Sequence, residues 1–533
     1  MEAINQQHFD VIIIGGGVSG LTAAALLSKA GLSVCLLEKQ YMLGGYLQGF
    51  QRKEYNFDTA IHWLNQYGKN GTVTKLFRFI GNDFPVPQEM QKIQRHKTAH
   101  HDYTLTNHPD TLKAQLQTDF PHEKEGIEQF FLAAKKIANV SLKFDKLFRS
   151  KETFNGLQKL FYGLKQLRII APIIPYALTG SGEKGVKKGL TKFFKDENLH
   201  KLFCTENDLL SCLFPIAWAY NNDYQNPPIG GSQVIPKWLE ENIVKFKQSK
   251  VLTSTTVTKI HVEHHRFVGV DFTNRAKSYH VTGDFLIAAC DISKLYNDLL
   301  PKSYLPKRFN EKLAKADMYS SSVTISLILD VPVESLGFGT ELIMLCDDSL
   351  PREEHMSGNP ETSHISVLAP TSRDHTMTPV GQGMITLYVP AWMEYENYWQ
   401  TERKPNGEFI KTEAYKALKE KFADIVIGRI EKQLCPTIRE HIIHQEIATP
   451  ITYYRYTHNL NGTIMGTRPG KENMQNKVAR YQTTVPNIFI GGHWAELGGG
   501  VPIAVKAAFN SSLLVLKSKN KKAFQELVNH MDT

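Results

Sequence analysis

Residues able to hold a nucleotide cofactor stand near the start of this 533-residue chain. Gly15, Gly17 and Gly20 follow an apolar run at 11–14 with the spacing G-x-G-x-x-G. Glycines so spaced make a tight turn, let a pyrophosphate approach the backbone, and let a helix pack against a strand. Glu38 follows Gly20 by eighteen residues, where a carboxylate accepts hydrogen bonds from ribose hydroxyls. Because that carboxylate would repel a 2′-phosphate, the pattern predicts a site for FAD or NAD rather than NADP.

The elements expected around these glycines fit such a site. The continuous β-branched run at 11–14 predicts a strand buried on both faces of a parallel sheet. A helix is expected over about 18–29, with its N-terminal N–H groups and dipole directed at the pyrophosphate. A second strand then ends at Glu38. This order of strand, helix and strand makes the motif far more specific than three glycines alone.

A second glycine pair, Gly44 and Gly45, follows Glu38 by six residues. In flavoproteins of the glutathione-reductase type, such a pair lets the chain pass beside the FAD diphosphate. Simple NAD dehydrogenases have no comparable use for it. The alternative interpretation is an ordinary turn. The pair therefore favours FAD over NAD.

The segment 487–505, NIFIGGHWAELGGGVPIAV, holds another group of glycines near the C-terminus. Its apolar start predicts a short strand that ends at Gly492. A helix is predicted to begin at Gly500 or Val501, and its N-terminus would point at the flavin pyrimidine. Reduced flavin holds negative charge there, which the positive helix end stabilises.

Polar and aromatic side chains between these glycines are candidates for the chemistry. His493 could shuttle a proton near neutral pH, and Glu496 could act as a base or stabilise an allylic cation. His62 and Trp63, from the front of the chain, could meet His493, Trp494 and Glu496 across the flavin. The catalytic candidates are His62, His493 and Glu496. The alternative is that these residues only hold loops by packing and hydrogen bonding.

The composition, with 42% hydrophobic and 22% charged residues, is that of a soluble globular protein. The six cysteines form no C-x-x-C pair, which indicates a reducing compartment and no structural zinc. We find no secretory signal and no apolar run of about 20 residues that would span a bilayer. The sequence therefore predicts a cytoplasmic protein.

The net charge of +9 is concentrated in one segment. Residues 135–201 carry fifteen Lys or Arg against five Asp or Glu, interspersed with apolar residues. This mixture suits an anionic membrane surface better than nucleic acid, so we expect peripheral membrane association and no nucleic-acid partner. The alternative is a solvated basic helix face.

The remaining patterns divide the chain into a nucleotide-binding domain and a substrate domain. Residues 123–220 are predicted to be mainly helical. Residues 250–290 are predicted to contain strands that return to the nucleotide domain, with Val257 placed to lie against an adenine. Alternating strands over 320–390 predict an antiparallel sheet with one covered face, and 411–433 a long helix. We expect an α/β protein whose Rossmann-type (glutathione-reductase-like) FAD-binding domain is assembled from separated segments, with a mixed-sheet plus helical substrate domain. The FAD-binding segments are 1–85, 226–300 and 446–533, and the substrate segments are 86–225 (helical, membrane-associating) and 301–445.

Over nearly its full length the chain resembles the FAD-dependent carotenoid desaturase, carotenoid isomerase and retinol saturase family, relatives of the monoamine-oxidase-type flavoproteins. The resemblance rests on five stretches: DVIIIGGGVSGLTAAALLSKAG with the glycine pair after Glu38, NFDTAIHWL, PPIGGSQVIPKWLE with Val257, TPITYYRYTHNLNG, and PNIFIGGHWAELGGGVPIAVKAAFNSS. The first is common to many flavoproteins. The last two, in this order, are much more specific.

The resemblance implies an FAD-dependent oxidoreductase that desaturates, saturates or isomerises carbon–carbon double bonds of a lipophilic isoprenoid or polyene. The flavin would accept or return a hydride, with NAD(P)H or a quinone as candidate redox partner. The motif FDTAIHWL looks closer to the isomerase and saturase branch than to phytoene desaturases. One alternative is a flavin amine oxidase, but the stretch GGGVPIAV argues against it. Another is a prenyl-protein-binding protein of the GDP-dissociation-inhibitor type, for which we would expect the FAD motifs to be degraded. The oligomeric state does not follow from the sequence.

Overall fold

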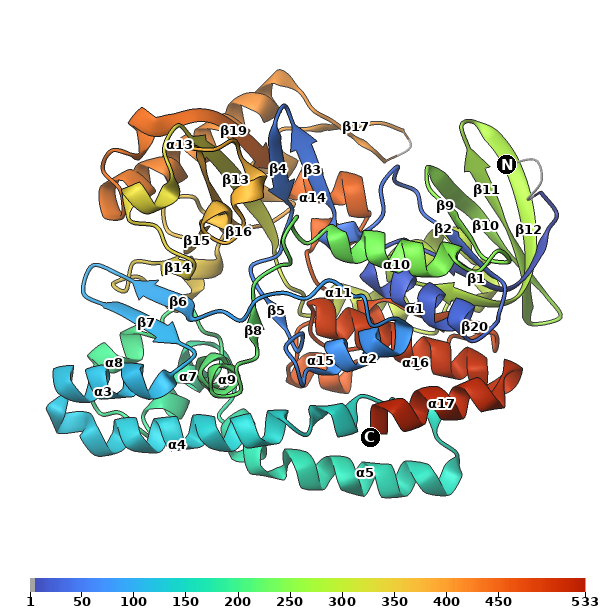
Figure 1. Ribbon diagram of the computed structural model, residues 1–533, viewed down its shortest axis with the longest axis horizontal. Coiled ribbons are helices and arrows are strands. Elements are labelled where there is room, and N and C mark those ends of the chain that lie inside the picture. The colour runs from blue at the N-terminus through green and yellow to red at the C-terminus, as the bar shows by residue number, and fades with distance from the viewer. Residues whose placement is uncertain (1–4, 406, 533) are drawn as a thin grey trace.

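Two seven-stranded sheets organise the protein in the computed structural model, which describes residues 5–405 and 407–532 (Figure 1). The first sheet has the order β10-β11-β12-β1-β2-β9, and β20 also pairs with β12. Its strands come from separated parts of the chain: β1 (His8–Ile14), β2 (Val34–Leu37), β9 (Lys250–Leu252), β10 (Thr255–Glu263), β11 (Arg266–Asn274), β12 (Lys277–Ala288) and β20 (Ile488–Ile490).

The long strand β12 joins two kinds of pairing in this sheet. Its first half pairs antiparallel with β11, whereas its second half pairs parallel with β1 and with β20. The parallel part brings the carboxyl ends of β1, β12 and β20 together, with Ile14 opposite Ala288 and Ala288 opposite Ile490. Ligands of open α/β sheets bind at such carboxyl ends.

Strand β1 is buried on both faces, as its sequence predicts. Val11 and Ile13 belong to a core formed with helices α1 (Val18–Lys29), α10 (Val234–Val244) and α16 (Val501–Lys519). Ile12 and Ile14 belong to the opposite core, under β10 to β12. The predicted helix at 18–29 and the helix start at Gly500 or Val501 are both confirmed.

The second sheet has the order β19-β13-β16-β15-β14-β6-β7 and is antiparallel except between β14 and β6. Its strands are β6 (Lys92–Lys97), β7 (Asp102–Thr106), β13 (Ser321–Leu329), β14 (Leu342–Leu345), β15 (Ile365–Leu368), β16 (Gly383–Ala391) and β19 (Ile442–Ala448). The predicted mixed sheet is therefore present, and the predicted α/β class is confirmed.

The expectation that this sheet has one covered face is wrong at its centre. Every residue of β13 and β16 is buried. Helix α13 (Glu413–Gln433) packs on one face through side chains such as Phe422. On the other face, Ile328 and Met384 pack against the hairpin of β3 (Gly49–Arg52) and β4 (Tyr55–Asp58). The polar Ser and Thr of these strands alternate with apolar residues but face the protein interior.

The mainly helical region predicted for residues 123–220 is confirmed. Helix α4 packs along α9, and α5 lies at the lower edge of the molecule in Figure 1. The helices are α3 (Pro109–Asp119), α4 (Lys124–Ser141), α5 (Gly156–Ile170), α6 (Ile174–Ala177), α7 (Gly182–Leu190), α8 (Glu197–Lys201) and α9 (Leu209–Tyr220). Within residues 5–405 and 407–532, no helix combines the length and hydropathy needed to cross a bilayer.

The remaining elements are short strands and connecting helices. The strands are β5 (Leu64–Asn65), β8 (Tyr224–Gln225), β17 (Glu402–Arg403) and β18 (Phe409–Ile410). The helices are α2 (Thr72–Ile80), α11 (Phe309–Lys315), α12 (Tyr395–Trp399), α14 (Pro450–Thr457), α15 (Lys471–Gln475) and α17 (Lys521–Asp532).

Candidate cofactor and active site

The glycine turn after β1 is shaped by close contacts on two sides and open space on the third. Gly15 has φ +107°, and a Cβ there would lie 2.6 Å from the carbonyl oxygen of Ala289. A Cβ on Gly20 would overlap the carbonyl oxygen of Gly15, so α1 packs directly on the turn. A Cβ on Gly17 would meet nothing within 4 Å. Gly17 therefore borders free space at the N-terminus of α1, where helix N–H groups favour an anion.

Glu38 is fixed at the carboxyl end of β2. Its Oε2 accepts a hydrogen bond from the backbone N–H of Gly16 at 2.5 Å, and its Oε1 accepts one from Gln40 at 2.7 Å. Burial raises the pKa of Glu38 above its usual value, and the two backbone donors counteract only part of that effect. Each carboxylate oxygen retains a lone pair for a further donor such as a ribose hydroxyl.

A cavity of about 340 Å³ extends from this turn toward the C-terminal glycine segment. Ala289 and Cys290, at the end of β12, line it between the two glycine segments. Nine of the ten residues proposed from the sequence to bind the cofactor line the cavity: Gly15, Gly17, Glu38, Gly44, Gly45, Val257, Gly492, Gly500 and Val501. The tenth, Gly20, lies behind the turn and supports it.

The far wall of the cavity is the loop between β20 and α16. Gly500 has φ +84° and is the N-cap of α16, with Pro502 in the first turn. Proline is tolerated there because the first-turn N–H has no intrahelical partner. The N-termini of α1 and α16 thus both border the cavity, and each favours negative charge. The cradle fits an extended dinucleotide with a diphosphate near Gly17 and an electron-accepting ring near Gly500.

His493 is the one of the three catalytic candidates that lines this cavity. Its Nε2 is buried and has no hydrogen-bond partner among the described residues. Burial lowers the pKa of His493 to about 4, so the imidazole is neutral near pH 7. Burial thus disfavours the charged imidazolium, and the role of His493 in proton transfer stays a prediction. A neutral imidazole can still donate or accept one hydrogen bond at this site.

His62 lies elsewhere, beyond Ile61. Its ring meets that of Tyr388 edge to face at 4.3 Å between centroids, and its carbonyl accepts a hydrogen bond from Arg373. Ile61 lines both the large cavity and a small cavity of about 20 Å³. Trp63 packs against Tyr224 in the core of the helical region. His62 and Trp63 therefore do not line the large cavity with His493.

Glu496 also differs from the sequence expectation. Its carboxylate accepts hydrogen bonds from the Tyr481 hydroxyl at 2.6 Å and from Lys506 Nζ at 3.2 Å, and it does not line the large cavity. Trp494 is only 2% exposed and belongs to the core beneath β12. A single 3-10 turn, His493–Ala495, separates these side chains, so adjacent residues point into different surroundings.

No sequence pattern predicted that polar groups would surround a small cavity, although Asp58 stands in the stretch NFDTAIHWL. Arg373, Asp58 and Tyr388 line it, yet Arg373 stands in no recognisable motif. The Arg373 Nη2 has no hydrogen-bond partner and, among the described residues, no carboxylate lies within 4.0 Å of its guanidinium. Burial lowers the pKa of Arg373 to about 10. This is an unpaired, buried cation beside the cavity that holds His493.

Comparison with known proteins supports the interpretation of the first lobe as a nucleotide-binding domain. Residues 13–80 match the family model of the NAD(P)-binding Rossmann-like domain. Prolycopene isomerase 1 of an Oncidium hybrid cultivar is 25% identical over 479 residues, covering 87% of this chain and 76% of that protein. The all-trans-retinol 13,14-reductase of Danio rerio is 22% identical, covering 97% of this chain and 88% of that protein. A solved putrescine oxidase variant has a TM-score of 0.59 at 13% identity, covering 99% of both chains.

The fold, the matched Rossmann-like domain and the named relatives together indicate a Rossmann-type oxidoreductase. Over most of its length the chain is similar to carotenoid and retinoid enzymes, in agreement with the sequence resemblance to the FAD-dependent carotenoid desaturase, carotenoid isomerase and retinol saturase family. The amine oxidases share its fold at 12–14% identity, a level that carries the fold alone. The carotenoid and retinoid enzymes are closer in sequence and cover most of the chain.

Proposed function

We propose that the chain binds FAD and uses it to desaturate, saturate or isomerise carbon–carbon double bonds of a lipophilic polyene. The observation that carries this proposal is the single cavity bordered by both glycine segments and by His493. The names of the relatives, a prolycopene isomerase and a retinol 13,14-reductase, indicate the substrate class. When bound, FAD supplies hydride transfer at N5.

The chain's own residues bind the cofactor and control its surroundings. Backbone N–H groups at the start of α1 hold the diphosphate, and Glu38 accepts the ribose hydroxyls. The N-terminus of α16 stabilises negative charge at the other end of the cavity. His493, being neutral, donates or accepts one hydrogen bond at Nε2 without adding charge to the cavity. Apolar side chains such as Ile61 and Met465 exclude water from the same space.

The direction of the reaction depends on the redox partner. Saturation consumes two electrons, for which NAD(P)H is a suitable donor, and desaturation releases two, for which a quinone is a suitable acceptor. Isomerisation has no net electron transfer. We propose that the same cavity can carry out any of these three reactions, and that the redox partner available in the cell decides which one occurs.

We further propose that the protein works at a membrane surface, from which a lipophilic substrate is drawn. Helix α5 exposes one apolar face at three- and four-residue spacing, flanked by Lys159, Lys165 and Arg168. A basic helix with such a face lies in the interface of anionic lipids. The exposed side chains are Leu157 (77%), Leu160 (63%), Phe161 (68%), Leu164 (59%) and Leu167 (54%).

The experiment follows flavin absorbance in the purified protein. Protein reconstituted with FAD should bind one flavin per chain, and anaerobically reduced or oxidised enzyme should react with a polyene or retinoid. An amine is the control substrate, since it separates the polyene activity from that of an amine oxidase. Absence of bound flavin after reconstitution would exclude both enzymes, and turnover of an amine alone would exclude the polyene activity.

A further inference from the structure

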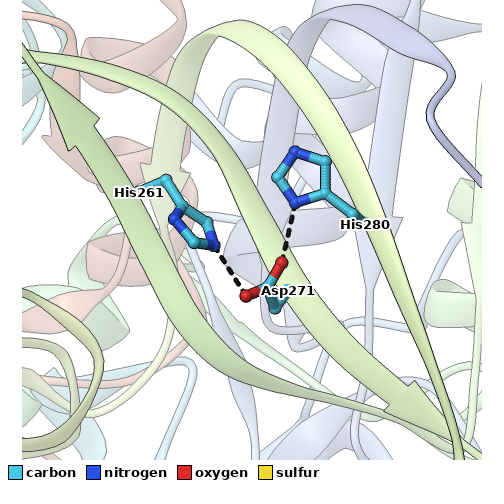
Figure 2. A group of neighbouring side chains, drawn as sticks. All are labelled: His261, Asp271 and His280. Carbon is cyan, nitrogen blue, oxygen red and sulfur yellow. Dashed lines mark hydrogen bonds and ion pairs between the residues drawn. The ribbon is translucent and has the colours of Figure 1, made fainter.

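Three partly exposed side chains on β10, β11 and β12 point toward one another. Figure 2 shows Asp271 between His261 and His280. The Asp271 carboxylate lies 2.6 Å from His261 Nε2 through Oδ2 and 2.7 Å from His280 Nδ1 through Oδ1. The two imidazole centroids are 5.2 Å apart. The three ligand atoms thus lie within 4.8 Å of one another.

The strands place these residues on one face by simple alternation. Ile260, Val270 and Val281, their neighbours in sequence, are fully buried in the core on the opposite face. Asp271 stands directly opposite His280 in the pairing of β11 with β12. All three polar side chains remain 28–38% exposed, so an ion from solvent can reach them.

His261 reaches the same point because the pairing of β10 with β11 is irregular. The register shifts on either side of it, between Val257 and Lys259 and between His261 and Val262. Such bulges redirect side chains. Gly269, opposite His261, leaves room for the neighbouring ring, since a Cβ there would lie 3.1 Å from His280 Nε2. Three adjacent strands therefore each contribute one ligand to one point.

From this geometry we propose that His261, Asp271 and His280 bind a divalent transition-metal ion, with Zn²⁺ as the ligand set's best match. Two imidazole nitrogens and one carboxylate are a common three-ligand set for zinc, which leaves one position for water. Zinc ligands stand about 2.0–2.2 Å from the ion. Because the present contacts are hydrogen bonds, binding replaces the imidazole protons facing Asp271 with the ion.

The charge around the site permits one divalent ion. Asp271 carries the negative charge of the triad. Its two oxygens each lie within hydrogen-bond distance of one imidazole, Oδ2 of His261 and Oδ1 of His280. Lys259 stands opposite Asp271 in the strand register and opposes the ion. Removal of that lysine should therefore strengthen binding.

The site is connected to the cofactor lobe through β10. Val257, four residues before His261 on that strand, lines the large cavity. An ion held by three strands fixes their register and with it the position of β10. Zinc should therefore raise the thermal stability of the lobe, because it binds the folded state in preference to the unfolded chain.

The test measures Zn²⁺ binding to chelator-treated protein that carries no polyhistidine tag, by calorimetry, with Co²⁺ absorption as a spectroscopic probe of the ligand field. We expect one saturable Zn²⁺ per chain, at least about tenfold weaker in Asp271→Asn and in His261→Gln, since loss of even an outer partner costs about 10–100-fold. Lys259→Ala should bind more tightly. Flavin content and far-ultraviolet circular dichroism confirm that each variant is folded.

The matched control is His265→Gln, because His265 is an exposed histidine in the turn between β10 and β11 of the same hairpin. It should bind Zn²⁺ as the unmodified protein does. The proposal is overturned if the unmodified protein shows no saturable binding, or if folded Asp271→Asn and His261→Gln bind as tightly as His265→Gln. Both readouts are independent of turnover, so they do not depend on the proposed function.

Discussion

The hydroxyl of Tyr481 lies 2.6 Å from Glu496 Oε1, inside a network that ties the C-terminal glycine segment to α16. Lys506, on α16, lies 3.2 Å from the other carboxylate oxygen. Asn510, one turn further along α16, donates to the same tyrosine oxygen at 3.3 Å. Glu496 thus holds the loop that forms the far wall of the cofactor cavity.

Glu496→Gln should therefore lower stability rather than remove a reacting group. Burial raises the pKa of Glu496, but the charges of Lys506 and Lys477 and the hydrogen bonds to the carboxylate lower it by more. The pKa of Glu496 therefore lies below its usual value of 4.5. A carboxyl whose folded pKa is lowered stabilises the fold above that value and loses the effect as the pH falls through it. We expect a loss of about 2 kcal/mol at pH 7. Thermal unfolding followed from pH 7 to about pH 2 should show the difference shrinking below pH 4.5; a constant difference would contradict the ionic role.

His493→Ala should separate catalysis from cofactor binding. The side chain lines the cavity but is not part of the glycine cradle, so flavin should be retained while turnover falls by about 10²–10⁴-fold if Nε2 donates or accepts the proton. His493→Gln is the matched variant, because its amide keeps one donor and one acceptor. Normal turnover in His493→Ala would make its role structural.

The same histidine predicts a specific pH dependence. Its folded pKa of about 4 lies below the usual 6.5, so the unfolded chain binds a proton that the folded chain does not. Stability contributed by this site therefore falls as the pH drops from 6.5 toward 4. Over that interval, the free energy of unfolding of His493→Gln should decrease less with falling pH than that of the unmodified protein. The pH dependence of turnover should show no titration of His493 between pH 5 and 8.

Two neighbouring glycines should respond differently to the same substitution. Gly17→Ala adds a Cβ that meets nothing within 4 Å, so the fold should survive, but the methyl group projects into the space assigned to the diphosphate. We expect at least about tenfold weaker FAD binding, equal to about 1.4 kcal/mol. Titration of FAD followed by fluorescence measures it.

Gly20→Ala is the comparison, because its Cβ would overlap the backbone of Gly15. It should lower the unfolding temperature of the flavin-free protein, whereas Gly17→Ala should leave that temperature unchanged. Unaltered FAD affinity in Gly17→Ala would place the diphosphate elsewhere.

The apolar face of α5 predicts membrane binding that two substitutions weaken. Phe161→Ser with Leu164→Ser removes side chains that are 68% and 59% exposed, so the fold should not depend on them. Liposome flotation with anionic lipid should show at least about tenfold weaker binding, since each large apolar side chain contributes about 1.5–3 kcal/mol when buried. Val380→Ser with Met474→Ser is the control, because both residues are exposed elsewhere. Equal binding by both double variants, or none by the unmodified protein, would contradict the membrane proposal.

The sequence predicted elements whose local chemistry is strong. The turn from β1 into α1 and the start of α16 were predicted to within about a residue, because glycine spacing and a buried β-branched run allow few other conformations. The side chains of His62 and Glu496 were misplaced, since their directions depend on tertiary contacts with Tyr388 and Tyr481. The two covered faces of the second sheet were missed for the same reason: α13 and the β3–β4 hairpin come from distant parts of the chain.

Arg373 carries the last prediction, which concerns the substrate's polar end. Its Nη1 and Nε donate to the carbonyl oxygens of His62 and Thr340, but Nη2 has no partner within the part of the chain that the structure describes. A buried cation without a carboxylate partner is costly, so Arg373→Met, which keeps an unbranched side chain, should leave thermal stability unchanged or raise it. Retention of such a group beside the active cavity favours a function in binding.

Asp58 lines the same small cavity, so a donor and an acceptor face one space next to Ile61. That pair suits a hydroxyl group rather than an anion, because a hydroxyl can accept from Arg373 and donate to Asp58. We therefore expect Arg373→Met to lower kcat/KM for a hydroxylated polyene by about tenfold or more, as loss of a hydrogen bond to a charged group costs about 1.5–3 kcal/mol. Its kcat/KM for a hydrocarbon polyene should be unchanged. Equal losses on both substrates would instead show that Arg373 positions His62 or the sheet, and no loss on either would remove it from substrate recognition.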